Sequence, residues 1–202
     1  MVRLGISVES VTERRFVTLV LEEHFIGHGI YITPVSIGGN VSISRVNSEL
    51  NKLSRSFDYI TTFYDFYGFK GKTQEDSKTS LEEDMVSGVN DFTRNKLVPY
   101  IQMHEFEGLL FSSPVAIANN VEGKDIECWS EKILQNFGGN PEEINDSPLT
   151  APSKRLEQYT TYKKTIDGPN ICKEIGLNNI RARCNGFNDW LVKLETLPHI
   201  AI

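Results

Sequence analysis

Acidic residues far apart in the chain lie at the ends of stretches that resemble β-strands. Glu9 and Glu105 each follow an apolar stretch, and Asp65 lies near the end of a β-branched and aromatic one. Hard cations such as Mg²⁺ prefer carboxylate oxygens and take only a few of them from protein, which leaves room for water and phosphate. If the three stretches end at one edge of a sheet, these side chains could bind such a cation there.

Each carboxylate also has a purely structural explanation. Ser10-Val11-Thr12-Glu13 matches a capping box, in which Ser10 caps a helix and Glu13 bonds back to the Ser10 amide. Glu9 could simply be favoured by the helix dipole, and Asp65 could cap the following turn through its backbone. The functional interpretation is favoured because these residues share one predicted sheet edge.

The segment His104-Glu105-Phe106-Glu107 follows the fourth predicted strand and allows two interpretations. Residues 105 and 107 share a side in an extended chain and diverge on a helix. In the structural interpretation His104 bonds to backbone and Glu107 starts a helix. In the functional one at least one of the three belongs to the site. We favour Glu105, as the carboxylate that takes a proton from an attacking water.

Apolar periodicity predicts alternating strands and helices over the first hundred residues. The expected strands are 3–8, 31–37, one within 58–69 that ends near Asp65, and 98–103, and the expected helices cover 11–25, 42–53 and 81–97. Such alternation is typical of an α/β fold with a parallel sheet, in which ligands bind beyond the carboxyl ends of the strands. This arrangement would bring Glu9, Asp65 and Glu105 to a single edge.

Beyond Glu105 the predicted strands cease and the chain looks helical. We therefore expect an α/β core at 1–111 and a helical C-terminal extension at 112–202 that packs on it. The extension could be a lid, a homodimer surface or a docking face, and the sequence does not rank these.

The composition predicts a folded cytoplasmic protein. With 39% hydrophobic and 24% charged residues, a packed core is expected rather than disorder. No stretch approaches the roughly 20 apolar residues of a membrane-spanning helix, the N-terminus lacks a signal-peptide core, and the three cysteines form no CxxC pair. The net charge of −6 argues against general adhesion to nucleic acid, although a bound metal would add positive charge where a phosphate must sit.

An ordered series of motifs resembles one protein family. VESVTE at 8–13 resembles the opening motif of Toprim domains, which reads VEGxTE in the nuclease branch. TTFYDFYG at 61–68 and PYIQMHEFEGLLFSS at 99–113 are similar to blocks of the DUF4276 family of Toprim-like proteins. Further similar blocks are APSKRL at 151–156, YKKTIDGP at 162–169 and IGLNNIRARCNGFNDWL at 175–191. The resemblance covers nearly the whole chain.

The resemblance implies a Toprim-like Rossmannoid fold with a four-stranded, mostly parallel sheet. It also implies that Glu9, Glu13 and Asp65 bind Mg²⁺, for which Mn²⁺ can substitute. The bound metal is expected to serve the cleavage of DNA or RNA. Lys154 or Arg155, in a shared block, is expected to bind substrate phosphate. The family is similar to nuclease effectors of bacterial anti-phage systems, where a partner ATPase can hold the nuclease in check.

The chain departs from the Toprim pattern at two positions. Many Toprim proteins carry Asp-x-Asp after the third strand, whereas Tyr67 stands at the second position here, which puts a two-metal mechanism in doubt. Glu105 or Glu107 could replace the missing ligand. Ser10 replaces the glycine of the nuclease-branch motif.

Three hypotheses follow from these residues. The first is a Mg²⁺-dependent nuclease, and the second is an inactive Toprim-like subunit that binds a partner ATPase. The third is a hydrolase of nucleotides or another small phosphate ester, which the acidic surface would suit.

Overall fold

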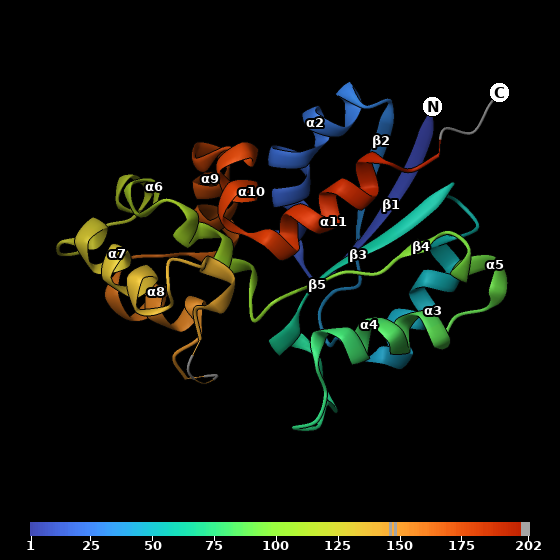
Figure 1. The fold of residues 1–202 in the computed structure, drawn as a ribbon, viewed down its shortest axis with the longest axis horizontal. Helices are drawn as coiled ribbons and strands as arrows, with labels where there is room; N and C mark the ends of the chain where they lie inside the picture. The colour runs from blue at the N-terminus through green and yellow to red at the C-terminus, as the bar shows by residue number, and fades with distance from the viewer. Residues whose placement is uncertain (146, 148, 199–202) are drawn as a thin grey trace.

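The computed structural model describes residues 1–145, 147 and 149–198. Five strands form a sheet, namely β1 (Val2–Val8), β2 (Ile30–Ser36), β3 (Tyr59–Asp65), β4 (Leu97–Val98) and β5 (Ile101–Gln102). The order is β2-β1-β3-β4, and β5 pairs with β3 further along the same edge. Every pairing given for these strands is parallel. The expected α/β class with a parallel sheet is confirmed (Figure 1).

Helices cover both faces of the sheet. On one side a continuous helical run comprises α1 (Val11–Phe16), a π-helical segment (Val17–Leu21) and α2 (Glu22–Gly27). On the other side lie α3 (Ile43–Leu53), α4 (Lys78–Ser87) and the short α5 (Asp91–Arg94), as Figure 1 shows. Two hydrophobic clusters result, one on each face, because successive strand side chains point to opposite sides.

The C-terminal half is helical, as expected. It contains α6 (Pro114–Asn120), α7 (Ile126–Asn136), α8 (Pro152–Tyr159), α9 (Lys164–Ile175), α10 (Leu177–Arg183) and α11 (Asn185–Glu195). Short 3₁₀ turns lie at Phe66–Gly68, Phe106–Ser112 and Pro141–Glu143.

The helical half shares its core with the sheet. Trp190 of α11 is fully buried, stacks on Phe63 and Tyr100, and donates its indole N–H to the Thr61 hydroxyl at 2.8 Å. Phe187 packs against Phe63 as well. Residues on both sides of position 112 therefore form one hydrophobic cluster.

Two expected elements differ from the structure. The helix expected at 81–97 is two helices, because Gly88 ends α4 and the Asn90 side chain accepts the Thr93 N–H to start α5. The strand expected at 98–103 is split into β4 and β5 around Pro99, which has no N–H to donate. At the split, the Thr62 hydroxyl accepts the Tyr100 N–H at 2.8 Å and donates to the Tyr100 carbonyl at 2.7 Å.

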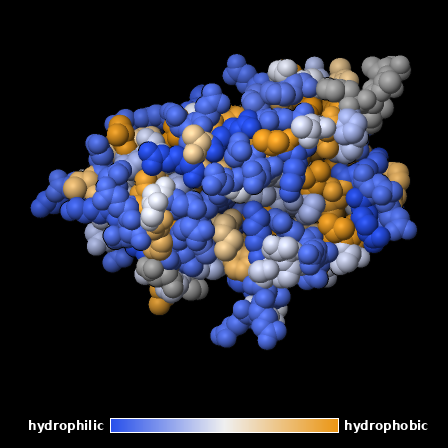
Figure 2. All heavy atoms as spheres, viewed as in Figure 1, coloured by the Kyte–Doolittle hydropathy of each residue, from blue (hydrophilic) through white to orange (hydrophobic). Residues whose placement is uncertain are grey.

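The surface of the face drawn in Figure 2 is mainly hydrophilic, with hydrophobic atoms in smaller patches. In the described part of the chain, no helix combines the length and the apolar character needed to span a bilayer.

Candidate metal site

Three neighbouring strands end at one edge of the sheet, and each leads into an acidic residue. In the parallel pairing of β1 with β3, Val8 lies opposite Phe63, so Glu9 and Asp65 leave adjacent strands at nearly the same level. Asp65 in turn pairs with Gln102 at the end of β5, three residues before Glu105. The structure thus brings together the strand-end carboxylates that the sequence predicted would share an edge.

The Lys164 ammonium group lies among these carboxylates. Its Nζ is 3.2 Å from Glu107 Oε2, 3.4 Å from Asp65 Oδ2 and 4.0 Å from Glu13 Oε1. Lys164 is the first residue of α9, and its side chain is 35% exposed whereas the three carboxylates are buried. An internal cation therefore lies where several buried anions converge.

Asp65 and Glu107 are held in place by further hydrogen bonds. Asp65 Oδ1 accepts the backbone N–H of Phe106 at 2.6 Å, which ties the end of β3 to the 3₁₀ turn after β5. Glu107 Oε1 accepts the Tyr162 hydroxyl at 3.2 Å. Each of these carboxylates keeps its second oxygen directed at Lys164.

Glu13 is both a helix cap and a member of the cluster. Its Oε2 accepts the Ser10 N–H at 2.8 Å and the Ser10 hydroxyl at 2.7 Å, which completes the capping box at the start of α1. Its Oε1 faces Lys164 instead. The structural interpretation of Glu13 therefore holds for one oxygen and leaves the other within the site.

Glu9 is positioned by the turn that follows β3. A Cβ on Gly68 would lie only 2.5 Å from Glu9 Oε2, so the glycine leaves the space that this carboxylate occupies. Burial raises the pKa of Glu9, and the charges of Glu13 and Glu105 raise it further, whereas Lys164 lowers it. Glu9 and Asp65 are therefore both affected by the charges of Glu13 and Lys164.

The buried charged groups shift one another's pKa values. Burial raises the pKa of Asp65 well above its usual value, and Glu13, Glu107 and Glu9 add to the rise, while Lys164 opposes it. Burial likewise raises the pKa of Glu107. Burial alone would lower the pKa of Lys164, but the surrounding carboxylates outweigh it and hold that pKa far above the usual range.

Glu105 lies at the rim of the cluster and faces a different element. Its Oε2 accepts the backbone N–H of Ser153, in the first turn of α8, at 2.9 Å. Its charge also contributes to the raised pKa values of Glu9 and Glu107. This carboxylate therefore belongs to the same electrostatic site while being fixed from the helical half.

The two basic residues predicted to bind phosphate have different surroundings. Lys154 is exposed, pairs with Glu157 at 2.6 Å, and is close enough to Glu105 and Glu107 for their charges to act on it. Arg155 donates to the Thr150 carbonyl at 2.6 Å, and its guanidinium lies 5.5 Å from the centre of the Phe137 ring. The structure places Lys154 towards the cluster and engages Arg155 with other parts of the chain.

Tyr67 and His104 border the acidic cluster without an ion pair to it among the described residues. Their rings lie 5.4 Å apart, and the Tyr67 N–H bonds to the His104 carbonyl at 3.0 Å. His104 has a positive φ of 61°, and its Nδ1 is buried with no partner in the described structure. Burial lowers the pKa of His104.

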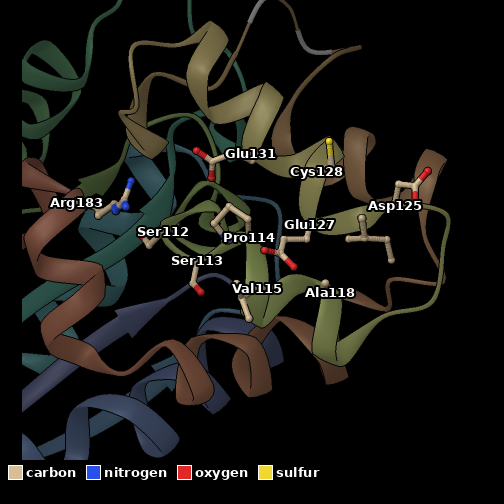
Figure 3. Close-up of a pocket in the computed structure, with 11 residues that line it drawn as sticks. Ser112, Ser113, Pro114, Val115, Ala118, Asp125, Glu127, Cys128, Glu131 and Arg183 are labelled. Carbon is tan, nitrogen blue, oxygen red and sulfur yellow. The ribbon is translucent and has the colours of Figure 1, made fainter.

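A separate cavity of about 730 Å³ opens between α6 and α7 (Figure 3). Its lining includes Ser113, Glu127 and Arg183, and none of the predicted site residues is among its described walls. The candidate metal site is therefore distinct from this cavity.

The donor chemistry at the sheet edge suits a hard divalent cation, although no three of these carboxylates place an oxygen within 4.8 Å of one another in the described residues, where the Lys164 ammonium lies among them. Five carboxylates of the described chain act on one another there, from Glu9, Glu13, Asp65, Glu105 and Glu107. Lys164 lies within 4.0 Å of three of these five carboxylates, so the described cluster holds more carboxylates than ammonium groups. Carboxylate oxygens are the ligands that Mg²⁺ and Mn²⁺ prefer.

Lys164 and Glu107 are the members that the sequence did not assign. Lys164 follows another lysine in a basic segment and lies 99 residues after Asp65, so nothing in its local pattern marks it as a site residue. Glu107 was one of three residues in an ambiguous segment. Its spacing of two from Glu105 suggested a shared side, but the 3₁₀ turn instead directs Glu107 inward and Glu105 towards α8.

Comparison with known proteins places the chain in a family. It belongs to the family described as a domain of unknown function, DUF4276, whose profile matches residues 8–195. No protein with a curated description matches it.

Two solved structures are similar to the chain, both of the C-terminal region of the OLD protein of Xanthomonas campestris pv. campestris. The one phased with mercury is 15% identical, with 96% of this chain and 98% of that chain covered and a TM-score of 0.42. The one phased with platinum is also 15% identical, with coverages of 96% and 95% and a TM-score of 0.40.

Proposed function

We propose that this member of the DUF4276 family is a Toprim-type nuclease that hydrolyses phosphodiester bonds with the help of Mg²⁺ or Mn²⁺. The observation that supports the proposal is that Glu13 of α1, Asp65 at the end of β3 and Glu107 after β5 surround Lys164, while Glu9 after β1 is subject to the same charges. Structural ion pairs need only equal numbers of opposite charges, and this edge carries a surplus of negative charge. A divalent cation would remove that surplus.

The proposal gives each carboxylate a separate task. Glu9, Asp65 and the Oε1 of Glu13 would hold the cation, and Oε2 of Glu13 would stay in the helix cap. Bound there, Mg²⁺ would neutralise a phosphate oxygen and lower the pKa of a coordinated water. Glu105, fixed by Ser153 at the rim, would accept the proton of the attacking water.

Lys164 supplies a fixed positive charge beside the reacting phosphate. Its side chain is partly exposed, and Lys164 is the first residue of α9, so it reaches the cluster from the helical half of the fold. An ammonium group held in this way stabilises negative charge that develops on a phosphate in the transition state. Lys154, which lies nearby and exposed, can attract the substrate backbone.

A cleavage assay tests this function. Single-stranded DNA, duplex DNA and transfer RNA are incubated with the protein and Mg²⁺ or Mn²⁺, alongside Glu9→Gln and Asp65→Asn. We expect metal-dependent cleavage of at least one polymer and a loss of more than about 100-fold in each variant, because ligand changes exceed the 10- to 100-fold cost of perturbing outer-shell groups. Cleavage that persists unchanged in both variants would refute the assignment of the site. Mononucleotides in the same assay separate polymer cleavage from hydrolysis of small phosphate esters.

A second candidate function is a Toprim-like subunit without catalysis that binds a partner ATPase, as in anti-phage systems. Two observations favour it. Lys164 already pairs with three of the carboxylates, and Tyr67 occupies the position of the second aspartate of the Toprim pattern. Protein that binds no Mn²⁺ at the acidic edge, cleaves none of the substrates and co-purifies with an ATPase would support this candidate instead.

A further inference from the structure

A second group of metal-binding side chains lies well away from the acidic edge. His24, His28 and Glu195 each place one ligand atom within 4.8 Å of the others. His24 lies 11 residues beyond Glu13 in the same helical run (24 − 13 = 11), which at 1.5 Å per residue is roughly 16 Å along the helix. The group is therefore not a part of the carboxylate cluster.

The helical spacing explains how the two histidines meet. Residues four apart lie on one face of a helix, and the rings of His24 and His28 are 4.6 Å apart between centroids. Glu195 is the last residue of α11, and its Oε1 lies 2.7 Å from Nε2 of His24. Helices α2 and α11, far apart in sequence, thus meet at this point (Figure 1).

The hydrogen bonds prepare His28 to bind a metal. Its Nδ1 lies 2.9 Å from the backbone carbonyl of His24. A carbonyl only accepts, so Nδ1 carries the proton, and in the neutral ring Nε2 carries the lone pair. A backbone bond of this kind is the usual way in which a metal-ligating histidine is oriented.

One further feature supports a cation at this place. The histidines lie at the C-terminal end of α2, where the helix dipole favours positive charge. Arg181 donates to both oxygens of Glu195, through Nη1 and, at 3.2 Å, through Nη2. This pairing keeps the carboxylate ionised and oriented, and burial, which would raise the pKa of Glu195, is outweighed by the bonds from Arg181 and His24.

We propose that His24, His28 and Glu195 form a transition-metal site of the Zn²⁺ class that links α2 to α11. Two imidazoles and one carboxylate are a common ligand set for Zn²⁺, with water in the fourth position. Imidazole selects Zn²⁺ or Co²⁺ over Mg²⁺. The metal would take the place of the hydrogen between Nε2 of His24 and Glu195, with the neutral His24 ring then carrying its proton on Nδ1.

A Co²⁺ titration of the whole chain in excess Mg²⁺ tests the site, because Mg²⁺ competes for the carboxylate cluster and poorly for imidazole. Tetrahedral Co²⁺ with nitrogen ligands absorbs strongly in the visible range, whereas six-coordinate Co²⁺ on oxygen ligands absorbs weakly. We expect one equivalent of strongly absorbing Co²⁺, displaced by Zn²⁺. The variant His28→Gln should bind more than about tenfold more weakly, with Glu23→Gln on the same helix as the exposed matched control.

His28 is exposed and bonds only to its own helix in the described structure, so its replacement should leave the His24–Glu195–Arg181 contacts intact. A purely structural ion-pair network would therefore not respond to His28→Gln. At 100 times the dissociation constant, Zn²⁺ should lower the unfolding equilibrium constant about 100-fold in the wild type and the Glu23→Gln control. The proposal is overturned if the absorption band is absent, if His28→Gln binds as tightly as the wild type, or if Asp65→Asn abolishes the band.

Discussion

At the scale of single residues, Lys164 supplies the positive charge that allows several buried carboxylates to lie close together. Asp65 and Glu107 are buried and would repel each other and Glu13 without a nearby positive charge. Lys164 lies within 4.0 Å of all three. Its stabilising effect is greatest when no divalent metal is present, because metal and ammonium neutralise the same charges.

Replacing Lys164 by Met should therefore destabilise the metal-free protein at neutral pH. Breaking a fully buried ion pair costs about 3–5 kcal/mol, and the 35% exposure of the Lys164 side chain reduces this to about 1–3 kcal/mol through solvent screening. Urea unfolding with and without Mg²⁺ measures the effect, and Mg²⁺ should restore part of the lost stability. Lys163→Met, at an exposed neighbouring position, is the matched control. Equal losses of unfolding free energy in the two variants would show that the carboxylate cluster is not stabilised by the Lys164 ammonium group.

Gly68 tests the placement of Glu9 without changing any charge. A Cβ at position 68 would meet Glu9 Oε2 at 2.5 Å, and the flexible carboxylate would have to move. Gly68→Ala should therefore weaken Mn²⁺ binding by about 10- to 100-fold, as other changes in ligand orientation do. The fold should be little affected, because only the end of a side chain is displaced.

Calorimetric Mn²⁺ titration of Gly68→Ala beside Gly27→Ala provides the comparison. A Cβ at Gly27 would meet nothing within 4 Å, so that variant should bind like the wild type. Wild-type affinity in Gly68→Ala would mean that Glu9 is not a ligand.

The strand-end carboxylates were predictable from sequence, and their partners were not. Glu9 and Asp65 follow recognisable strands, and the rule for parallel sheets places them at one edge. Lys164 reaches the site through the packing of α9, which no local pattern encodes. The His24 and His28 pair shows helical spacing, but Glu195 meets it only through the contact of α2 with α11.

At the scale of elements, the fourth strand shows how side chains replace missing backbone bonds. Pro99 interrupts the ladder, and the Thr62 hydroxyl bonds to both the N–H and the carbonyl of Tyr100. The β5 segment that follows leads into Glu105 and Glu107. The sequence predicted a strand in this region because its apolar residues are clear, but the compensation by Thr62 depends on the neighbouring strand.

Thr62→Val keeps the shape of this side chain and removes both bonds. We expect a loss of about 1–3 kcal/mol in unfolding free energy, because two polar groups of Tyr100 are left without this partner. Thr33→Val, at an exposed position of β2, should change the stability by less than about 0.5 kcal/mol. Thermal or urea unfolding measures both variants. If the two changes cost the same, the Thr62 bonds do not hold β5 to the sheet.

At the scale of the whole molecule, one hydrophobic cluster joins the sheet to the helical half. Trp190 and Phe187 of α11 contact Phe63 of β3, and Glu105 and Lys164 connect the site to α8 and α9. The helical character of the described part of the C-terminal half was predictable from the absence of strand patterns. The contribution of this part to the site was not predictable, because it arises from contacts between residues 48 to 151 positions apart.

The stability of the whole fold should depend on pH in opposite ways with and without metal. Burial raises the pKa values of Asp65, Glu107 and Glu9, so each binds its proton more tightly in the folded state. Such groups destabilise the fold where they are ionised, and the penalty is relieved as the pH falls through the raised pKa values towards about 4. The metal-free protein should therefore gain thermal stability on acidification from about pH 8 to about pH 5.

Mg²⁺ binds the ionised carboxylates, so its stabilising effect should grow as the pH rises over the same range. Melting temperatures measured with and without Mg²⁺ across this range give the difference directly. Asp65→Asn should make this difference less dependent on pH, because one of the carboxyl groups with a raised pKa is lost. A Mg²⁺ effect that is independent of pH in the wild type would contradict the assignment.

The most direct measurement is a calorimetric titration of Mn²⁺ into the wild-type protein, with one equivalent of Zn²⁺ per chain already present to fill the histidine group, and into Asp65→Asn under the same conditions. Asn keeps an oxygen for the Phe106 N–H but loses the charge that the cation needs. We predict one Mn²⁺ bound per chain at the acidic edge and affinity at least about 100-fold lower in the variant, beyond the outer-shell range. Equal binding by both proteins, or none by the wild type, would contradict a metal site at the ends of β1, β3 and β5.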